Sequence, residues 1–531
     1  MSVPETIPVL LRDTATRFGA AEAIVDAERV SFAELAERAI AAAKGCIAAG
    51  LRPGDRAAIW APNLLEWAVT ALGIVSAGGV VVPVNTRFKG SEARYILEKA
   101  GCRLLFTVRG FLGLDYPGML GQACGTSPLT ALESIIVIRE IGEVAGGGEL
   151  PWAVAEWDAF LGAGAEVDES RVDGAIAALG PGSLSDVIFT SGTTGNPKGV
   201  MASHSQTLRV FSTWAETVGL RSGDRYLVVN PFFHTFGYKA GLIAALITGA
   251  AVVPMATLDP VTLMKTVEEE RITVLPGPPT LYTTILDHPE RSKYDLTSLR
   301  LAVTGAANVP VELIRRMRSE LAFETVLTAY GLTEATGTVT MCRQGDSAET
   351  IANTSGRAIP GTEVQVVDGT GSVLAPGQPG EVVVRGYNVM AGYLDDPDQT
   401  AEAIDLEGWL HTGDIGVMDA EGNLKITDRK KDMFIVGGFN AYPAEIENVL
   451  CGHPAVSQAA VIGVPDDRMG EVGMAFVVCR SGTTVGPDEL ISWSRERIAN
   501  FKVPRSVKVV DALPLNASGK VVKGELRKLV G

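Results

Sequence analysis

An internal duplication constrains the fold of this chain more than any other feature of its sequence. Residues 51–56, Leu-Arg-Pro-Gly-Asp-Arg, recur as Leu-Arg-Ser-Gly-Asp-Arg at 220–225. An apolar run and a proline follow each copy, and the Val-Val-Pro of 81–83 recurs at 252–254 with nearly the same separation. Chance similarity is a poor explanation for features that match in the same order over more than thirty residues. The sequence therefore favours two related αβ units that pack side by side.

Two long uncharged stretches, 67–86 and 240–258, lie within the two copies. Their length alone would suffice for a membrane span. Each, however, contains a Gly or Gly-Gly break and then a Val-rich run that leads to a proline, which is typical of a buried helix, a turn and a buried strand of a parallel sheet. The sequence therefore predicts an α/β fold without a transmembrane span.

The chain has 531 residues, more than one hydrophobic core usually supports, so several domains are expected. From about residue 356 strand-like runs alternate with Gly/Pro turns, which indicates a small β-barrel, and an α+β module follows. The predicted division is a large N-terminal domain, 1–428, with αβ subdomains at about 1–180 and 181–355 and the β-barrel at 356–428; a hinge, 429–432; and a mobile α+β C-terminal domain, 433–531.

Composition narrows the partners and the compartment. The formal net charge of −16 argues against nucleic acid as a partner. Six cysteines are scattered without Cys-x-x-Cys pairs, which disfavours a disulfide framework or a zinc site and favours a reducing compartment. No basic segment followed by an apolar core opens the chain, so no signal peptide and a cytoplasmic location are expected.

Residues 190–199 form a loop rich in anion-binding groups. Four hydroxyls, three glycines and one lysine follow the apolar run 186–189. Glycine lets backbone N–H groups turn toward a ligand, and with the hydroxyls and the lysine these groups make a cradle for a polyphosphate. The loop differs from that of the P-loop NTPases because no Ser or Thr follows Lys198. The alternative is a plain surface linker, but linkers rarely open directly out of a buried strand. The candidate phosphate-binding residues are Thr190, Ser191, Gly192, Thr193, Thr194, Gly195 and Lys198.

The loop closely resembles the phosphate loop of the AMP-forming adenylating enzymes, which include acyl-CoA synthetases, the adenylation domains of peptide synthetases and beetle luciferases. Further motifs of that family follow in its order, so the resemblance spans essentially the whole chain. They are Phe-His-Thr-Phe-Gly at 233–237, Tyr-Gly-Leu-Thr-Glu at 330–334, Thr-Gly-Asp at 412–414, Asp-Arg-Lys-Lys-Asp at 428–432, Gly-Gly-Phe-Asn at 437–440 and Pro-Leu-Asn-Ala-Ser-Gly-Lys at 514–520.

The resemblance implies an ATP site and a Mg²⁺ site. Glu334 would be the metal ligand, with Thr194 nearby, since Mg²⁺ is commonly held by one or two carboxylates plus phosphates. Tyr330 would stack near the adenine, Asp414 would bind both ribose hydroxyls and Arg429 would contact the nucleotide. The remaining implied ATP/AMP contacts are Gly305, Ala306, Ala307, Gly331 and Thr333.

The resemblance also implies two half-reactions. Lys520, on the mobile domain, would serve the first, and rotation about Lys431 would start the second. His234 would be a gate between them; from the residues alone, a satisfied core histidine is the simpler interpretation. The implied acyl pocket contains His234, with Phe233 beside it. Tyr238 and Lys239 follow and are expected to face the same pocket, although the family pattern fixes neither position. The implied CoA contacts are Gly437, Gly438, Phe439, Phe501, Lys502 and Arg505.

The predicted function is that of an ATP-dependent acyl-CoA ligase, with a carboxylic acid, ATP and CoA as its small-molecule partners. An acyl-AMP ligase that loads a carrier protein and a non-catalytic binding protein on the same fold are the alternatives. Segments 230–239, 275–280 and 303–307 resemble fatty-acyl-CoA synthetases, and within them the subgroup that activates a bicyclic indanedione propanoate from steroid (cholesterol) catabolism. A medium- or long-chain fatty acid is the other candidate substrate, and a homodimer stays open.

Overall fold

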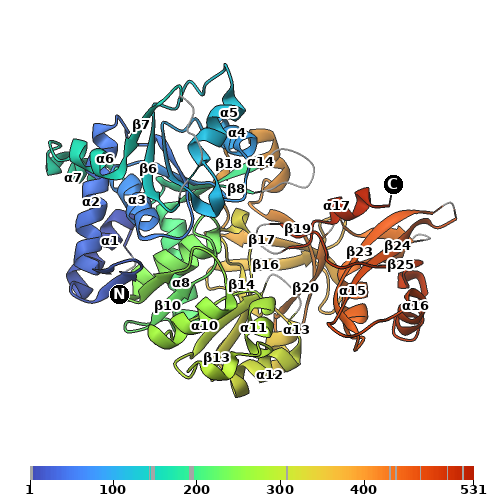
Figure 1. Ribbon diagram of the computed structural model, residues 1–531. Helices are drawn as coiled ribbons and strands as arrows, with labels where there is room; N and C mark the ends of the chain where they lie inside the picture. Colours follow the sequence, from blue (N-terminus) through green and yellow to red (C-terminus); the bar gives the residue numbers. More distant parts are fainter. Residues whose placement is uncertain are drawn as a thin grey trace.

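The structure is a computed structural model that describes residues 4–142, 144, 150–190, 197–305, 309–429, 432–436, 439–466, 468–498, 500–516 and 520–530. A large N-terminal part and a smaller C-terminal part lie side by side, with the chain termini at opposite ends (Figure 1). One hydrophobic core runs from Ile7 to Leu394, and a separate core runs from Phe434 to Val507. The C-terminal part therefore has a core of its own.

The first sheet has eight strands in the order β18-β9-β8-β4-β3-β5-β6-β7. Its strands from β8 to β7 are parallel, whereas β9 runs antiparallel to β8 and β18 antiparallel to β9. The strands are β3 (Arg56–Trp60), β4 (Val80–Pro83), β5 (Leu104–Arg109), β6 (Ser134–Glu140), β7 (Ala153–Glu156), β8 (Leu184–Thr190), β9 (Lys198–Ser203) and β18 (Gly392–Tyr393). The helices of this region are α1 (Ile7–Phe18), α2 (Phe32–Ala48), α3 (Leu65–Ser76), α4 (Gly90–Ala100), α5 (Tyr116–Cys124), α6 (Trp157–Gly164) and α7 (Glu169–Ala178).

The second sheet consists of two four-stranded segments, β10-β11-β1-β2 and β12-β13-β14-β15. Single β-bridges from Val274 connect the two segments. Its strands are β1 (Glu22–Val25), β2 (Arg29–Ser31), β10 (Arg225–Val228), β11 (Ala251–Pro254), β12 (Leu301–Gly305), β13 (Thr325–Tyr330), β14 (Thr340–Met341) and β15 (Arg357–Ala358). Its helices are α8 (His204–Val218), the π-helix η2 (Phe236–Ile243), α9 (Ala244–Thr248), α10 (Pro260–Glu269), α11 (Pro279–Leu286), α12 (Val311–Glu320), the 3₁₀ turn η4 (Thr333–Ala335) and α13 (Ala348–Asn353).

The duplicated sequence folds into the same turn twice. The Arg52 N–H donates to Asp55 Oδ2 at 2.9 Å, and the Arg221 N–H donates to Asp224 Oδ2 at 2.9 Å. Each turn leads into a parallel pair, β3–β4 in the first sheet and β10–β11 in the second. The two αβ units therefore share their entry turn as well as their strand order.

The sheets do not divide at residue 180, where the sequence suggested a boundary between subdomains. Strands β8 and β9 extend the first sheet, with Asp186 beside Val81 of β4. In return, the hairpin β1–β2 joins the second sheet, with Ile24 beside Val252. Each unit therefore contributes strands to the sheet of the other. Such pairings depend on which sheet edges come close in the folded chain, and the order of the strands along the sequence does not predict them.

The region predicted as a small β-barrel contains a four-stranded antiparallel sheet in the order β16-β17-β19-β20. Among the described residues β20 does not pair with β16, so these four strands form an open sheet and not a closed barrel. In Figure 1 it lies between the αβ units and the C-terminal part. Its elements are β16 (Thr362–Val367), β17 (Pro379–Gly386), α14 (Pro397–Ala403), β19 (Leu410–Met418) and β20 (Leu424–Arg429).

The C-terminal part is an α+β module with the strand order β22-β21-β24-β23 and β25 paired to β24. Its elements are β21 (Phe434–Val436), β22 (Phe439–Ala441), α15 (Pro443–Cys451), β23 (Val456–Asp466), β24 (Gly470–Cys479), α16 (Pro487–Arg495), η5 (Asn500–Lys502), β25 (Ser506–Val509) and α17 (Lys523–Lys528). In the part of the chain that the structure describes, no helix is both long and apolar enough to cross a bilayer.

Candidate active site

The two ends of the predicted phosphate loop lie on a hairpin. Strands β8 and β9 are antiparallel, and Thr190 at the end of β8 is the register partner of Lys198 at the start of β9. The hairpin thus brings a hydroxyl and an ammonium to the same edge of the first sheet. Residues between them fall outside the described ranges, including the predicted contacts Ser191, Gly192, Thr193, Thr194 and Gly195.

Glu334 lies next to this hairpin. It sits in the 3₁₀ turn that follows β13, and its Oε1 accepts hydrogen bonds from Thr190 Oγ1 at 3.3 Å and from the Tyr393 hydroxyl at 3.1 Å. A half-buried carboxylate beside a phosphate loop fits a Mg²⁺ ion that phosphate oxygens share. No cluster of three His, Cys, Asp or Glu side chains among the described residues could hold a metal without such help.

Tyr330 and Asp414 come together from different sheets. The Tyr330 hydroxyl donates to Asp414 Oδ2 at 2.6 Å, and the Asp414 carboxylate is buried on β19. Gly331, the next residue, is in close backbone contact, because a Cβ there would lie 2.1 Å from the Gly337 carbonyl oxygen. Gly305 is the last residue of β12 and pairs with Ala329, which precedes Tyr330 on β13. The predicted contacts Ala306 and Ala307 lie outside the described ranges.

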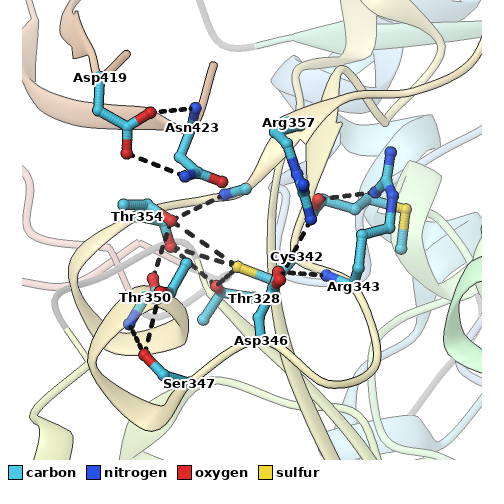
Figure 2. Close-up of polar contacts among 12 residues, drawn as sticks. Thr328, Cys342, Arg343, Asp346, Ser347, Thr350, Thr354, Arg357, Asp419 and Asn423 are labelled. Atoms are coloured by element: carbon cyan, nitrogen blue, oxygen red, sulfur yellow. Dashed lines mark hydrogen bonds and ion pairs between the residues drawn. The ribbon is translucent and has the colours of Figure 1, made fainter. Parts of the chain in front are cut away.

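A network of polar contacts around Thr328 connects β13 with neighbouring segments (Figure 2). Thr328 Oγ1 lies 3.1 Å from Cys342 Sγ and 2.9 Å from the carbonyl oxygen of Thr354. Asp346 accepts from the guanidinium of Arg357 at 3.1 Å. The network connects β13 with β14 and α13. It therefore fixes the strand that ends at Tyr330, the residue predicted to stack near the adenine.

The charge of Lys520, in the C-terminal part, acts on His234 in the N-terminal part. The imidazole Nδ1 accepts from the Phe236 N–H at 3.2 Å. The ring keeps exposed surface, yet protein atoms crowd it enough that desolvation, with the nearby Lys520 charge, lowers the pKa of His234 to about 4. His234 is therefore neutral at pH 7, and the C-terminal part contributes a positive charge to its surroundings.

The loop that carries Lys520 is held by its own hydrogen bonds. The Lys520 N–H donates to Asn516 Oδ1 at 2.9 Å, and the Asn516 N–H donates to the Lys520 carbonyl at 2.8 Å. The charge of Lys520 acts on His234, the residue predicted to gate the acyl site.

Of the predicted acyl-pocket residues, Phe233 is half-buried beside His234, whereas Tyr238 lies in the core. The Tyr238 ring is fully buried and packs edge-on against Trp67, with ring centroids 5.3 Å apart. It therefore lines no open space in this structure. The π-helix that begins at Phe236 explains the difference, because its extra residue per turn changes which side chains face inward.

Lys239, expected to face the acyl pocket, instead forms a buried ion pair on this helix. Lys239 Nζ lies 2.9 Å from Asp186 Oδ1, and both side chains are at most 2% exposed. Ser185 Oγ donates to the other carboxylate oxygen at 2.7 Å. Each residue is visible in the sequence as a lone charge in an apolar run, but nothing there links the two. The pair connects β8, which leads to the phosphate loop, with the helix that follows His234.

The predicted CoA contacts are only partly described. Lys502 Nζ lies 2.6 and 2.7 Å from the carboxylate oxygens of Glu445, so this cation is neutralised in the present arrangement. Phe501 packs against the C-terminal core, and Arg505 is exposed. The backbone of Phe439 lies on β22, and that of Arg429 ends β20. The positions of Lys431, Gly437 and Gly438 fall outside the described ranges.

Comparison with known proteins identifies the class of this site. The AMP-binding enzyme family matches residues 11–394, and the AMP-binding enzyme C-terminal domain matches residues 445–520. The chain therefore belongs to the AMP-binding enzyme family.

Relatives in that family show the chemistry. The chain is 50% identical over 526 residues to the 3-[(3aS,4S,7aS)-7a-methyl-1,5-dioxo-octahydro-1H-inden-4-yl]propanoyl:CoA ligase of Rhodococcus jostii, covering 99% of both chains. It is 51% identical over 506 residues to the ligase of the same name from Mycobacterium tuberculosis, covering 95% of each. ATP-bound MatB from Rhodopseudomonas palustris matches with a TM-score of 0.84 and 29% identity over 98% of each chain. The chain is thus an ATP-dependent, AMP-forming acyl-CoA ligase, which confirms the activity predicted from the sequence.

Proposed function

We propose that this ligase activates a steroid-derived bicyclic propanoate. The observation that carries the proposal is the 50% identity, across 99% of both chains, to a ligase named for such an acid. The surroundings of His234 support it. The half-buried ring of Phe236 packs edge-on against Trp214, with ring centroids 6.1 Å apart. Apolar rings of this kind favour a compact apolar ring system over a small polar acid.

Unpartnered buried donors near His234 support a substrate that carries ketones. Trp214, which packs against Phe236, and Thr235, which precedes Phe236 in the chain, each have a buried donor, Nε1 and Oγ1, without a hydrogen-bond partner among the described residues. A buried donor without a partner is costly, and a ligand oxygen relieves that cost. Two ring ketones offer such oxygens, whereas the alkyl chain of a fatty acid offers none.

In the first half-reaction, a carboxylate oxygen of the acid attacks the α-phosphorus of ATP and pyrophosphate leaves. We assign charge neutralisation at this step to Lys520 and to the loop that Thr190 and Lys198 flank. Asp414, Tyr330 and Arg429 would hold the nucleoside. Glu334 and Thr194 would hold Mg²⁺, which when bound neutralises phosphate charge.

In the second half-reaction, the sulfur of CoA attacks the acyl carbon and AMP leaves. We assign the pivot between the steps to Lys431 and the path of the thiol to the backbone of 437–439. Lys502 would contact the nucleotide end of CoA only after it separates from Glu445, because the pair is closed in the present arrangement. Arg505, which is exposed, is the more accessible cation of the two.

The test is pyrophosphate release with four acids: the indanedione propanoate, its ketone-free hydrocarbon analogue, octanoate and hexadecanoate. We expect the diketone to give the highest kcat/KM, at least about tenfold above both fatty acids, or about 1.4 kcal/mol. A fatty acid that is better by the same margin would overturn the substrate and leave the ligase activity intact. Thioester formation with CoA, compared with a pantetheine-loaded carrier protein, separates the ligase from a carrier-loading enzyme.

A further inference from the structure

Tyr393 lies on a strand that closes the edge of the phosphate-loop hairpin. Strand β18 pairs antiparallel with β9, with Tyr393 opposite Val200. The Leu394 N–H donates to the Gly199 carbonyl at 2.8 Å, and the Ala391 N–H donates to Met201 at 3.0 Å. The segment that connects β17 to β19 thus lies directly beside β9, the strand that follows the phosphate loop.

The Tyr393 hydroxyl fixes the carboxylate of Glu334. It donates to Oε1 at 3.1 Å, the same oxygen that Thr190 contacts at 3.3 Å. A phenol is protonated at neutral pH, so the Tyr393 hydroxyl is the donor of this bond and the Glu334 carboxylate is the acceptor. Both donors act on Oε1, and Oε2 makes no hydrogen bond with another described residue. The main chain is held as well, because the Met390 N–H donates to the Glu334 carbonyl at 2.8 Å.

The ring of Tyr393 also positions the lysine of the loop. Lys198 Nζ lies 4.9 Å from the ring centroid, a distance at which the aromatic face attracts a cation. The same ammonium donates to Gln399 Oε1, on α14 of the same segment. One side chain therefore contacts an anionic group with its hydroxyl and a cationic group with its ring, and both groups belong to the proposed ATP site.

We propose that Tyr393 is a positioning residue for ATP, which holds the Glu334 carboxylate with its hydroxyl and the Lys198 ammonium with its ring. This inference rests on the proposed roles of Glu334 and Lys198. Its physical basis is preorganisation: two flexible charged side chains are fixed before the nucleotide arrives, so less conformational freedom is lost on binding.

Tyr393→Phe and Tyr393→Leu test the inference. The Phe variant keeps the ring and loses the hydroxyl, whereas the Leu variant loses both contacts. We expect Tyr393→Phe to raise the KM for ATP in pyrophosphate release by about tenfold, or about 1.4 kcal/mol, and Tyr393→Leu to raise it further. The KM for the acid and the rate of thioester formation from supplied acyl-adenylate should not change. Equal losses in all of these readouts would mean a purely structural role and would overturn the inference.

The matched control is Tyr387→Phe. Tyr387 lies in the same segment, and its ring faces the Arg209 guanidinium at 3.9 Å. This variant should leave the KM for ATP unchanged. Melting temperatures check folding, and Tyr393→Phe should match the wild type within about 2 °C, because an isosteric ring preserves the packing.

A double-mutant cycle separates this inference from the assignment of the metal site. Glu334→Gln and Tyr393→Phe should be strongly non-additive in the KM for ATP, because both disrupt one contact. Additive effects would overturn the positioning role. If Glu334→Gln alone leaves the Mg²⁺ and ATP dependence unchanged, the proposed metal site fails. If it changes that dependence while Tyr393→Phe does not, only the inference about Tyr393 fails.

Discussion

Removal of the positive charge from the buried Lys239–Asp186 pair should destabilise the N-terminal part strongly. In Lys239→Met, the Asp186 carboxylate stays in the core, 1% exposed, without the ammonium 2.9 Å away. Breaking a buried pair in this way costs about 3–5 kcal/mol, because an uncompensated charge remains buried. The neighbouring Ser185 hydroxyl, at 2.7 Å, supplies one hydrogen bond and no charge.

The expected change in melting temperature follows from the size of the core. The core spans Ile7 to Leu394, and unfolding entropy of about 2.1 cal/mol/K per residue gives about 0.8 kcal/mol/K for this unit. A loss of 3–5 kcal/mol should therefore lower the melting temperature by about 4–6 °C. Thermal unfolding followed by circular dichroism measures it.

Two variants make this prediction specific to the buried charge. Lys239→Met combined with Asp186→Asn removes both charges and should recover most of the loss, because a neutral pair needs no counter-ion. Lys293→Met breaks an exposed pair with Glu290, whose side chains are 64% and 40% exposed, and should leave the melting temperature unchanged. An unchanged melting temperature in Lys239→Met, or a double variant less stable than the single one, would refute the reasoning.

Three further predictions concern acid stability, the metal and the acyl pocket. Burial and the Lys239 charge lower the pKa of His204 to about 4 from 6.5, so the unfolded chain binds more protons as the pH falls. Stability should decrease by about 1.4 kcal/mol per pH unit from pH 6.5 to about 4, and His204→Gln should flatten this slope in unfolding curves. Glu334→Gln should raise the Mg²⁺ concentration needed for half-maximal pyrophosphate release; an unchanged titration removes Glu334 from the metal site. Acetate, with little area to bury, should show kcat/KM at least about a hundredfold below the best acid, or about 2.7 kcal/mol, and a similar efficiency would contradict a large apolar pocket.

Features of the fold that depend on local pattern could be predicted from the sequence. The Val-rich runs do form β4 and β11, and the repeated Gly-Asp-Arg turns precede β3 and β10. Pairings between distant strands could not be predicted in this way. The contact of β18 with β9 and the crossing of the β1–β2 hairpin into the second sheet depend on which edges meet in space.

The same distinction applies to the site. Glu334, Tyr330 and Asp414 could be named because ordered motifs carry them, and the structure brings the last two into contact at 2.6 Å. Tyr393 could not be named, since its relevance arises only from its contacts with Glu334 and Lys198 in the folded chain.

Other local features also carry no sequence signal. A π-helix starts just after His234, and Tyr238 on it lies in the core, although its closeness to His234 in the sequence suggested a pocket residue. Glu445 neutralises Lys502 from the first turn of α15, a contact between segments well separated in the sequence.

The most direct test of the account is a comparison of the two half-reactions in Lys520→Ala. The structure brings Lys520 near His234, where its charge contributes to the lowered pKa of that residue, and we assign it to the first step alone. Pyrophosphate release from acid and ATP should be abolished, while thioester formation from a supplied acyl-adenylate and CoA should stay close to the wild-type rate. Equal loss of both steps in a folded variant would contradict the account, because one mobile cation would then serve both half-reactions.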